Sequence, residues 1–229
     1  MDALQAIRHR RSVRQYSDTP VPDEILDRLL RLTLLAPTGG MAQAWSLIVV
    51  RDPDKRAAVA DIVIRGGAEY FRTVRRPAEG KSAEEHAEWA AGYARQALGT
   101  YPQVPVWIVG LRVPRHAMPA DQQAGERDTD LTSIGMAFEN LFVAARAMGL
   151  GTVPTIFHLY HEAELRRLLD IPAEHEIPLV TPLGYPVEFP VGLPPALASI
   201  RRPWQTLVHD DGWGNPRATS ERGSGAAAR

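Results

Sequence analysis

Apolar residues recur every three to four positions along much of the chain, a period typical of helices that bury one face. The pattern predicts helices over residues 3–9, 22–35, 54–64, 82–98, 130–148 and 162–169. Glycine pairs are expected to end two of them, Gly66 and Gly67 after the third and Gly149 and Gly151 after the fifth. Ser82 and Glu85 have the spacing of a capping box at the start of the fourth.

Short aliphatic and β-branched runs predict buried strands between these helices. They cover residues 47–50, 104–111 and 177–183, with a weak fourth run at 206–209. Strands and helices do not alternate regularly, which favours an α+β fold over a doubly wound sheet. The chain also lacks the glycine pattern of a Rossmann site and the Walker motif of a P-loop.

The amino-acid composition excludes several classes of function for this protein. The chain has 229 residues, 45% of them apolar and 23% charged, enough for one large domain or two small ones. A net charge of −1 offers no attraction to nucleic acid or to an anionic membrane. The absence of cysteine excludes disulfides, thiolate metal sites and cysteine nucleophiles. The charged N-terminus and the lack of a bilayer-length apolar run favour the cytoplasm.

A cationic segment, Arg10-Arg11-Ser12-Val13-Arg14, follows the first predicted helix. In an extended conformation Arg10, Ser12 and Arg14 project to one side, and Arg11 projects to the other. Guanidinium groups bind phosphate oxygens in pairs, and a hydroxyl adds a donor, so this side can bind a phosphate. On spacing alone, a solvated basic helix end that complements the helix dipole is the simpler explanation.

Five motifs give the segment a context. Arg-Arg-Ser-Val-Arg-Gln-Tyr at residues 10–16 resembles the opening motif of the nitroreductase family of flavoenzymes. Ala-Pro-Thr-Gly-Gly-x-x-Gln-x-Trp at residues 36–45 resembles the second motif of that family. Gly-Leu-Gly-Thr at 149–152, Leu-Gly-Tyr-Pro at 183–186 and Arg-Arg-Pro at 201–203 follow in the family's order. The resemblance covers the chain from about residue 4 to residue 210.

The resemblance implies a fold as well as a cofactor. It implies a central mixed or antiparallel sheet flanked by helices, in an intertwined homodimer with flavin mononucleotide (FMN) at the interface. The single FMN-binding domain would span residues 1–215, with a helical excursion at about 65–103 and a disordered tail over 216–229. Aromatic residues of the excursion could cover the flavin, although local packing is the slightly favoured explanation for each of them.

The same resemblance assigns site residues. It implies that Arg10, Ser12, Arg14 and Arg201 hold the FMN phosphate. Arg11, which points away toward the edge of the ring or a carboxylate, and Arg202 are further candidate contacts of the cofactor. It places the flavin ring against the second motif of the other subunit, with these candidate contacts: Pro37, Thr38, Gly39, Gly40, Met41 and Gln43. The segment that contains Pro154, Thr155 and Ile156 falls where backbone amides of the family approach the N5 and O4 edge of the ring. Met41 replaces the asparagine common in the family, and Ala44 replaces a proline, which leaves the substrate open.

The implied reaction is ping-pong hydride transfer. NAD(P)H would reduce the flavin, which would then reduce a nitroaromatic, a quinone or an activated alkene, and the flavin rather than a side chain would carry the chemistry. Alternatives on the same fold are a flavin dehydrogenase, a dehalogenase, a flavin-fragmenting enzyme, or a relative with a deazaflavin partner. A non-catalytic flavin-binding protein is the alternative of another class.

Two further clusters have simpler explanations. His158 and His161 lie three residues apart, as metal ligands on a helix can, but no third ligand completes a pattern, so no metal site is expected. Glu126, Asp128 and Asp130 are expected to complement the N-terminus of the long helix that begins at residue 130.

Overall fold

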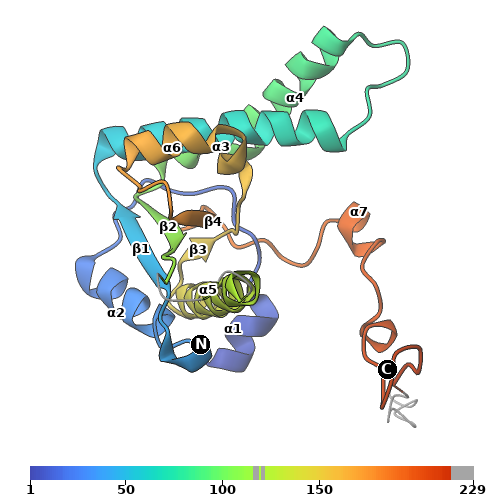
Figure 1. Ribbon diagram of the computed structural model, residues 1–229. Helices are drawn as coiled ribbons and strands as arrows, with labels where there is room; N and C mark the ends of the chain where they lie inside the picture. The colour runs from blue at the N-terminus through green and yellow to red at the C-terminus, as the bar shows by residue number, and fades with distance from the viewer. Residues whose placement is uncertain (116–118, 120–121, 218–229) are drawn as a thin grey trace. The chain divides into compact units, whose positions relative to one another are not determined.

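The computed structural model describes residues 1–115, 119 and 122–217 (Figure 1). Contacts divide the chain into two units, Met1–Val191 and Gly192–Arg229. The single domain over residues 1–215 stays a prediction. The tail predicted over 216–229 lies, from residue 218 onward, outside the described residues.

An antiparallel sheet of four strands forms the centre of the first unit, in the order β1-β2-β4-β3. The strands are β1 (Trp45–Val50), β2 (Val106–Arg112), β3 (Gly151–Thr152) and β4 (Glu176–Gly184). The prediction of an α+β fold with a central sheet between helices is therefore confirmed. Strand β3 was not predicted, and the weak strand expected at 206–209 is wrong, since a short 3-10 helix, η4 (Trp204–Thr206), overlaps it.

Helices cover both faces of the sheet (Figure 1). On one face lie α3 (Pro53–Val74), α4 (Ala83–Leu98) and α6 (Glu162–Leu168). On the other lie α2 (Asp23–Thr33) and α5 (Gln123–Ala147), and α1 (Ala3–His9) packs on α5. Alternate side chains of β2 enter the two cores, Trp107 and Val109 on the α3 side and Ile108 on the α5 side. All of β2 is therefore buried.

The helix predicted over residues 54–64 extends to Val74, so the expected break at Gly66 and Gly67 is wrong. Both glycines are buried inside α3, opposite Phe157 at the start of η3 (Phe157–His161). Because these glycines have no side chains, α3 can pack closely against the start of η3. They do not end the helix. The capping box between Ser82 and Glu85 is confirmed at the start of α4.

Helix α5 begins at Gln123, earlier than predicted. Of the residues just before α5, residues 116–118, 120 and 121 lie outside the described residues. Glu126 lies in the first turn of α5, where a carboxylate complements the helix N-terminus as expected, whereas Asp130 lies too far along the helix to do so. Both carboxylates are buried and form ion pairs with Arg115 and Arg112.

The second unit contains α7 (Pro195–Ala198) and η4. Local hydrogen bonds organise it: an Arg202 guanidinium nitrogen donates to the Thr206 carbonyl at 3.0 Å, and Arg217 pairs with Asp210 at 2.7 Å. The side chain of Arg201 is exposed.

Candidate functional site

The cationic segment is extended and joins the sheet beside β3. Ser12 forms a parallel bridge with Thr152, and the Val13 amide donates to the Thr152 carbonyl at 3.0 Å. A β-carbon on Gly151 would lie 2.8 Å from a Val13 methyl group, so only glycine permits this contact. The backbone that carries Arg10, Ser12 and Arg14 is thereby fixed to the sheet.

The polar groups of this segment are largely uncommitted. Among the described residues, Arg14 forms no ion pair and the Ser12 hydroxyl makes no hydrogen bond. The Arg10 Nε atom lies 3.7 Å from a Glu139 carboxylate oxygen, which is a long and partly exposed contact. These three side chains remain able to bind an anion.

Arg11 is engaged differently. One of its guanidinium nitrogens donates to the carbonyls of Arg8 and Arg10, at 2.9 and 2.7 Å. The side chain therefore folds back onto the end of α1, and its contact with the cofactor stays a prediction.

Three hydrogen bonds also hold the chain beyond Arg14. The Tyr16 amide donates to the Thr100 hydroxyl at 2.9 Å, and that hydroxyl donates to the Arg14 carbonyl at 3.2 Å. The Tyr16 hydroxyl donates to the Val13 carbonyl at 2.8 Å. Burial raises the pKa of Tyr16, and the nearby Tyr101 adds to this, so the phenol remains a donor at neutral pH.

The second motif forms a tight turn around η1 (Gly39–Met41). The Thr38 carbonyl accepts from the Met41 amide at 3.2 Å, and the Thr38 hydroxyl accepts from the Gln43 amide at 3.0 Å. Gly40, Met41 and Gln43 all have left-handed backbone angles, with φ of 56°, 56° and 48°. Met41 and Gln43 bear side chains that disfavour this region, so the turn holds two strained residues.

This turn is held against α5 and presents its side chains outward. The Gly39 amide points at the Ser133 hydroxyl at 3.4 Å, and a β-carbon on Gly39 would lie 2.4 Å from a Thr129 methyl group. Pro37 and Gln43 are exposed, and Met41 is 75% exposed. Among the described residues, no hydrogen bond or ion pair links the turn to the cationic segment of the same chain.

The third predicted segment lies beside β4. The Thr155 amide donates to the Val180 carbonyl at 3.0 Å, and the Val180 amide donates back at 3.2 Å. The Phe157 amide donates to the Thr155 hydroxyl at 3.2 Å, and Pro154 has no N–H. The Ile156 amide has no hydrogen-bond acceptor within the described part of the chain. It is therefore available to a ligand.

The sequence predicted four groups of site residues: the cationic segment, the turn at 37–43, residues 154–156, and the pair Arg201 and Arg202. The structure brings the first and the third together. Thr152 pairs with Ser12, and Thr155 follows it after two residues, so the cationic segment and residues 154–156 share one end of the sheet. The turn at 37–43 lies elsewhere on α5. Arg201 and Arg202 belong to the second unit, and their role stays a prediction.

A buried ionic cluster that lies near the end of the second motif was not predicted from the sequence. The Arg112 Nε atom lies 3.0 Å from an Asp130 oxygen, and Arg115 reaches both Asp130 and Glu126, at 3.1 and 2.9 Å. Arg112 pairs across the sheet with Trp45, at the end of the motif. The one signal in the sequence was the four-residue spacing of Glu126 and Asp130, which places both on one helix face.

His158 has a structural role. Its Nε2 atom is bonded to the Ile177 carbonyl at 2.9 Å, and burial lowers the pKa of the ring, so it is neutral. Within the described residues, no group of three or more His, Asp or Glu side chains could hold a metal ion. Nor is any described helix both long and apolar enough to cross a membrane.

Comparison with known proteins decides the family. The model of the nitroreductase family matches residues 7–185. The chain belongs to the nitroreductase family. The resemblance found in its motifs is therefore confirmed.

Named relatives agree. The chain is 30% identical over 193 residues to "Putative NADH dehydrogenase/NAD(P)H nitroreductase" of Methanothermobacter thermautotrophicus, which covers 83% of this chain and 80% of that protein. It is 28% identical over 182 residues to iodotyrosine deiodinase 1 of Pongo abelii, over 80% of this chain and 60% of that protein.

Solved structures show the same fold at lower identity. A hypothetical oxidoreductase of Bacillus subtilis superposes with a TM-score of 0.71 and 19% identity, over 94% of this chain and 76% of its own. An iodotyrosine deiodinase bound to FMN and 3-iodo-L-tyrosine superposes with a TM-score of 0.63 and 21% identity, over 84% and 94% of the two chains.

Proposed function

We propose that this protein is a homodimeric, FMN-dependent oxidoreductase that takes hydride from NAD(P)H and reduces a small organic acceptor in a ping-pong cycle. Family membership supports the class of enzyme and its flavin. The observation that carries the proposal is the pairing of Ser12 with Thr152, which brings the side chains of Arg10, Ser12 and Arg14 and the free Ile156 amide to the same edge of the sheet.

The donor set fits the FMN phosphate. Arg10, Ser12 and Arg14 offer two guanidinium groups and a hydroxyl, and none of them makes a short side-chain contact within the described residues. Charge-assisted hydrogen bonds of this kind are short and strong. Because the backbone of the segment is fixed to β3, little ordering is required when the phosphate binds. Arg201 and Arg202 would add to this set.

The Ile156 amide is the group that would face the edge of the flavin ring. Its neighbours are committed to β4 and to Thr155, so the amide is held in place rather than free to turn. A donor at the ring edge stabilises negative charge there and would favour the reduced cofactor. When bound, FMN accepts hydride from the nicotinamide and passes it, or its electrons, to the acceptor.

An apolar face supports the dimer. Exposed aliphatic side chains of α1 and α2 adjoin a groove of about 580 Å³ against α5, lined in part by Ile7, Leu32, Leu35, Val143 and Ala147. Leu4 and Leu35 are 73% and 76% exposed, which is unfavourable in an isolated chain. A partner docked on this face would bring its own turn at 37–43 toward the flavin. Light scattering after size-exclusion chromatography measures the mass of the particle in solution. A monomer that retains FMN would contradict the proposed dimer.

The visible spectrum tests the function directly. Freshly purified protein is expected to show oxidised flavin that bleaches when NADPH or NADH is added without oxygen. Bleached protein should regain its colour when a quinone or nitroaromatic is added, with one acceptor reduced per flavin. No flavin after reconstitution with FMN would overturn the proposal.

The iodotyrosine deiodinase relative favours a second candidate, reductive dehalogenation. In that reaction two electrons and a proton replace iodine on an aromatic carbon by hydrogen, and iodide leaves. Anaerobic protein reduced with dithionite would release iodide from 3-iodo-L-tyrosine if this candidate holds. Flavin that NADPH reduces rapidly, with no iodide released, would exclude it.

A further inference from the structure

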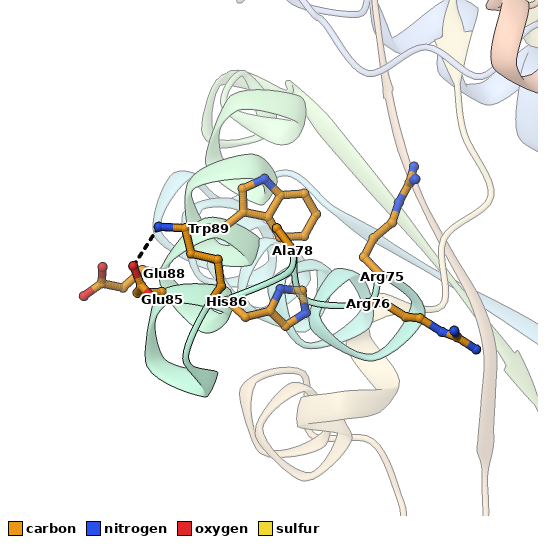
Figure 2. Close-up of a pocket in the computed structure, with 8 residues that line it drawn as sticks. Arg75, Arg76, Ala78, Glu85, His86, Glu88 and Trp89 are labelled. Atoms are coloured by element: carbon orange, nitrogen blue, oxygen red, sulfur yellow. Dashed lines mark hydrogen bonds and ion pairs between the residues drawn. The ribbon is translucent and has the colours of Figure 1, made fainter.

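A hollow of about 640 Å³ lies between the end of α3 and the start of α4, at the tip of the helical excursion (Figure 2). Arg75 and Arg76 lie on one side of it, and Trp89 and His86 on the other, as Figure 2 shows. None of these residues belongs to the cationic segment, to the turn at 37–43 or to residues 154–156, and a role of the excursion's aromatic residues as a cover for the flavin stays a prediction. The hollow therefore calls for an explanation of its own.

The two arginines are uncommitted. No carboxylate of the described residues lies within ion-pair distance of the guanidinium of Arg75 or Arg76, and both side chains are exposed. The third cation of the hollow, Lys81, is paired with Glu85 at 2.8 Å, marked by the dashed line in Figure 2. Glu88 is the remaining carboxylate of the lining, so the hollow has a net positive charge.

Its aromatic wall is a row of rings packed against one another. The His86 ring is buried and bonded to the Arg72 carbonyl at 3.1 Å. Trp89 stacks on it, with ring centroids 5.4 Å apart and planes 7° from parallel, and Tyr93 stacks on Trp89 at 5.6 Å. Tyr93 in turn meets Phe71 of α3 edge to face at 4.8 Å. The indole is thus fixed, yet it remains 44% exposed.

We propose that this hollow binds a planar aromatic anion, a ring that carries a carboxylate or a phosphate. The exposed part of the fixed indole offers apolar contact to the ring at little cost in entropy. The guanidinium groups of Arg75 and Arg76 point in different directions in Figure 2, and because both side chains are exposed, either can turn to donate to the anionic group. The simpler alternative is that both arginines only complement the C-terminal dipole of α3 and bind nothing.

Titration calorimetry on the FMN-loaded protein tests the site. The probes are 2-naphthoate with its neutral analogue 2-naphthamide, and adenosine 5′-phosphate with adenosine, which separate a carboxylate ligand from a phosphate ligand. We expect at least one anion to bind about tenfold or more tightly than its neutral analogue. The double variant Arg75→Gln/Arg76→Gln should abolish that preference.

A matched control removes two charges elsewhere. Arg28→Gln/Arg167→Gln alters exposed arginines outside the hollow and should retain the binding. Trp89→Leu should weaken both the anion and its analogue, and it keeps the proposal testable if the arginine variant does not fold. The proposal is overturned if neither anion is preferred, if both double variants lose binding equally, or if binding shifts the flavin spectrum and survives the Arg75 and Arg76 changes.

Discussion

Gly66 and Phe157 meet so closely that a β-carbon on Gly66 would lie 1.9 Å from the Phe157 carbonyl oxygen. The contact joins the middle of α3 to the segment whose Ile156 amide is free for a ligand. Because the opposing atom belongs to the backbone, it cannot turn aside as the end of a side chain can. The position of residues 154–156 therefore depends on the absence of a side chain at residue 66.

Gly66→Ala is expected to displace that segment. Overpacking should cost about 1–3 kcal/mol of unfolding free energy and weaken FMN binding. Gly67→Ala is the control, because its β-carbon would meet side-chain atoms of Leu98 and Phe157 at 3.0 and 3.2 Å. Both changes gain the same helix propensity, about 1 kcal/mol. Urea unfolding and FMN titration measure the difference, and equal losses in the two variants would contradict the argument.

Met41→Asn is expected to stabilise the protein. Met41 has a φ of 56°, a region that asparagine tolerates better than methionine, and the gain should be about 0.5–1 kcal/mol. Gln43→Asn provides a comparison at a φ of 48° in the same turn. A higher melting temperature in both variants would show relief of backbone strain. A lower melting temperature would refute the argument from backbone strain. A change in acceptor preference in Met41→Asn alone would show that Met41 helps to form the acceptor site.

The sequence predicted the fold where a pattern was long enough. The helical periods located all the larger helices, and the capping box at Ser82 fixed the start of α4. Strand β3 has two residues, too few for any pattern to reveal. The end of α3 was misjudged because a glycine that ends a helix and a glycine that allows close packing look the same in a sequence. Only the position of Phe157, far along the chain, separates the two.

The candidate site was also predictable only in part, where a pattern within one segment was enough. The alternation of Arg10, Ser12 and Arg14 indicated one shared side only if the segment is extended, and the structure supplies the strand that holds it extended. The cluster around Arg112 and Asp130 was misjudged because its partners come from separate elements. Asp130 was expected to interact favourably with the helix dipole because the helix was predicted to begin there. Since α5 begins earlier, at Gln123, Asp130 lies inside the helix.

Arg14→Ala is expected to lower FMN affinity about tenfold or more, because it removes a charge-assisted contact to the phosphate. The fold should persist, since the exposed side chain forms no ion pair among the described residues. Fluorescence titration of apoprotein with FMN measures the affinity. Arg28→Ala on α2 removes an equal charge and should bind FMN as the unaltered protein does. Unchanged FMN retention in Arg14→Ala would refute the role of Arg14.

Glu176 gives the protein an acid-sensitive contact. Hydrogen bonds from Arg127 and then from Arg112 lower the pKa of its carboxyl below the ordinary value of 4.5. Since the folded state binds this proton less readily than the unfolded chain, the stabilisation is complete above about pH 4.5 and is lost as the pH falls through the lowered pKa.

Glu176→Gln should therefore be less stable than the unaltered protein at pH 7, by about 1 kcal/mol because the pair is partly exposed to solvent. The difference should shrink as the pH falls below 4.5 and vanish once the folded protein is protonated at residue 176. Thermal unfolding from pH 3 to pH 7 measures both curves. Glu188→Gln is the control, because Glu188 is exposed and forms no ion pair within the described residues, so its curve should follow that of the unaltered protein. A constant difference between Glu176→Gln and the unaltered protein at every pH would show that the loss is one of packing, not of charge.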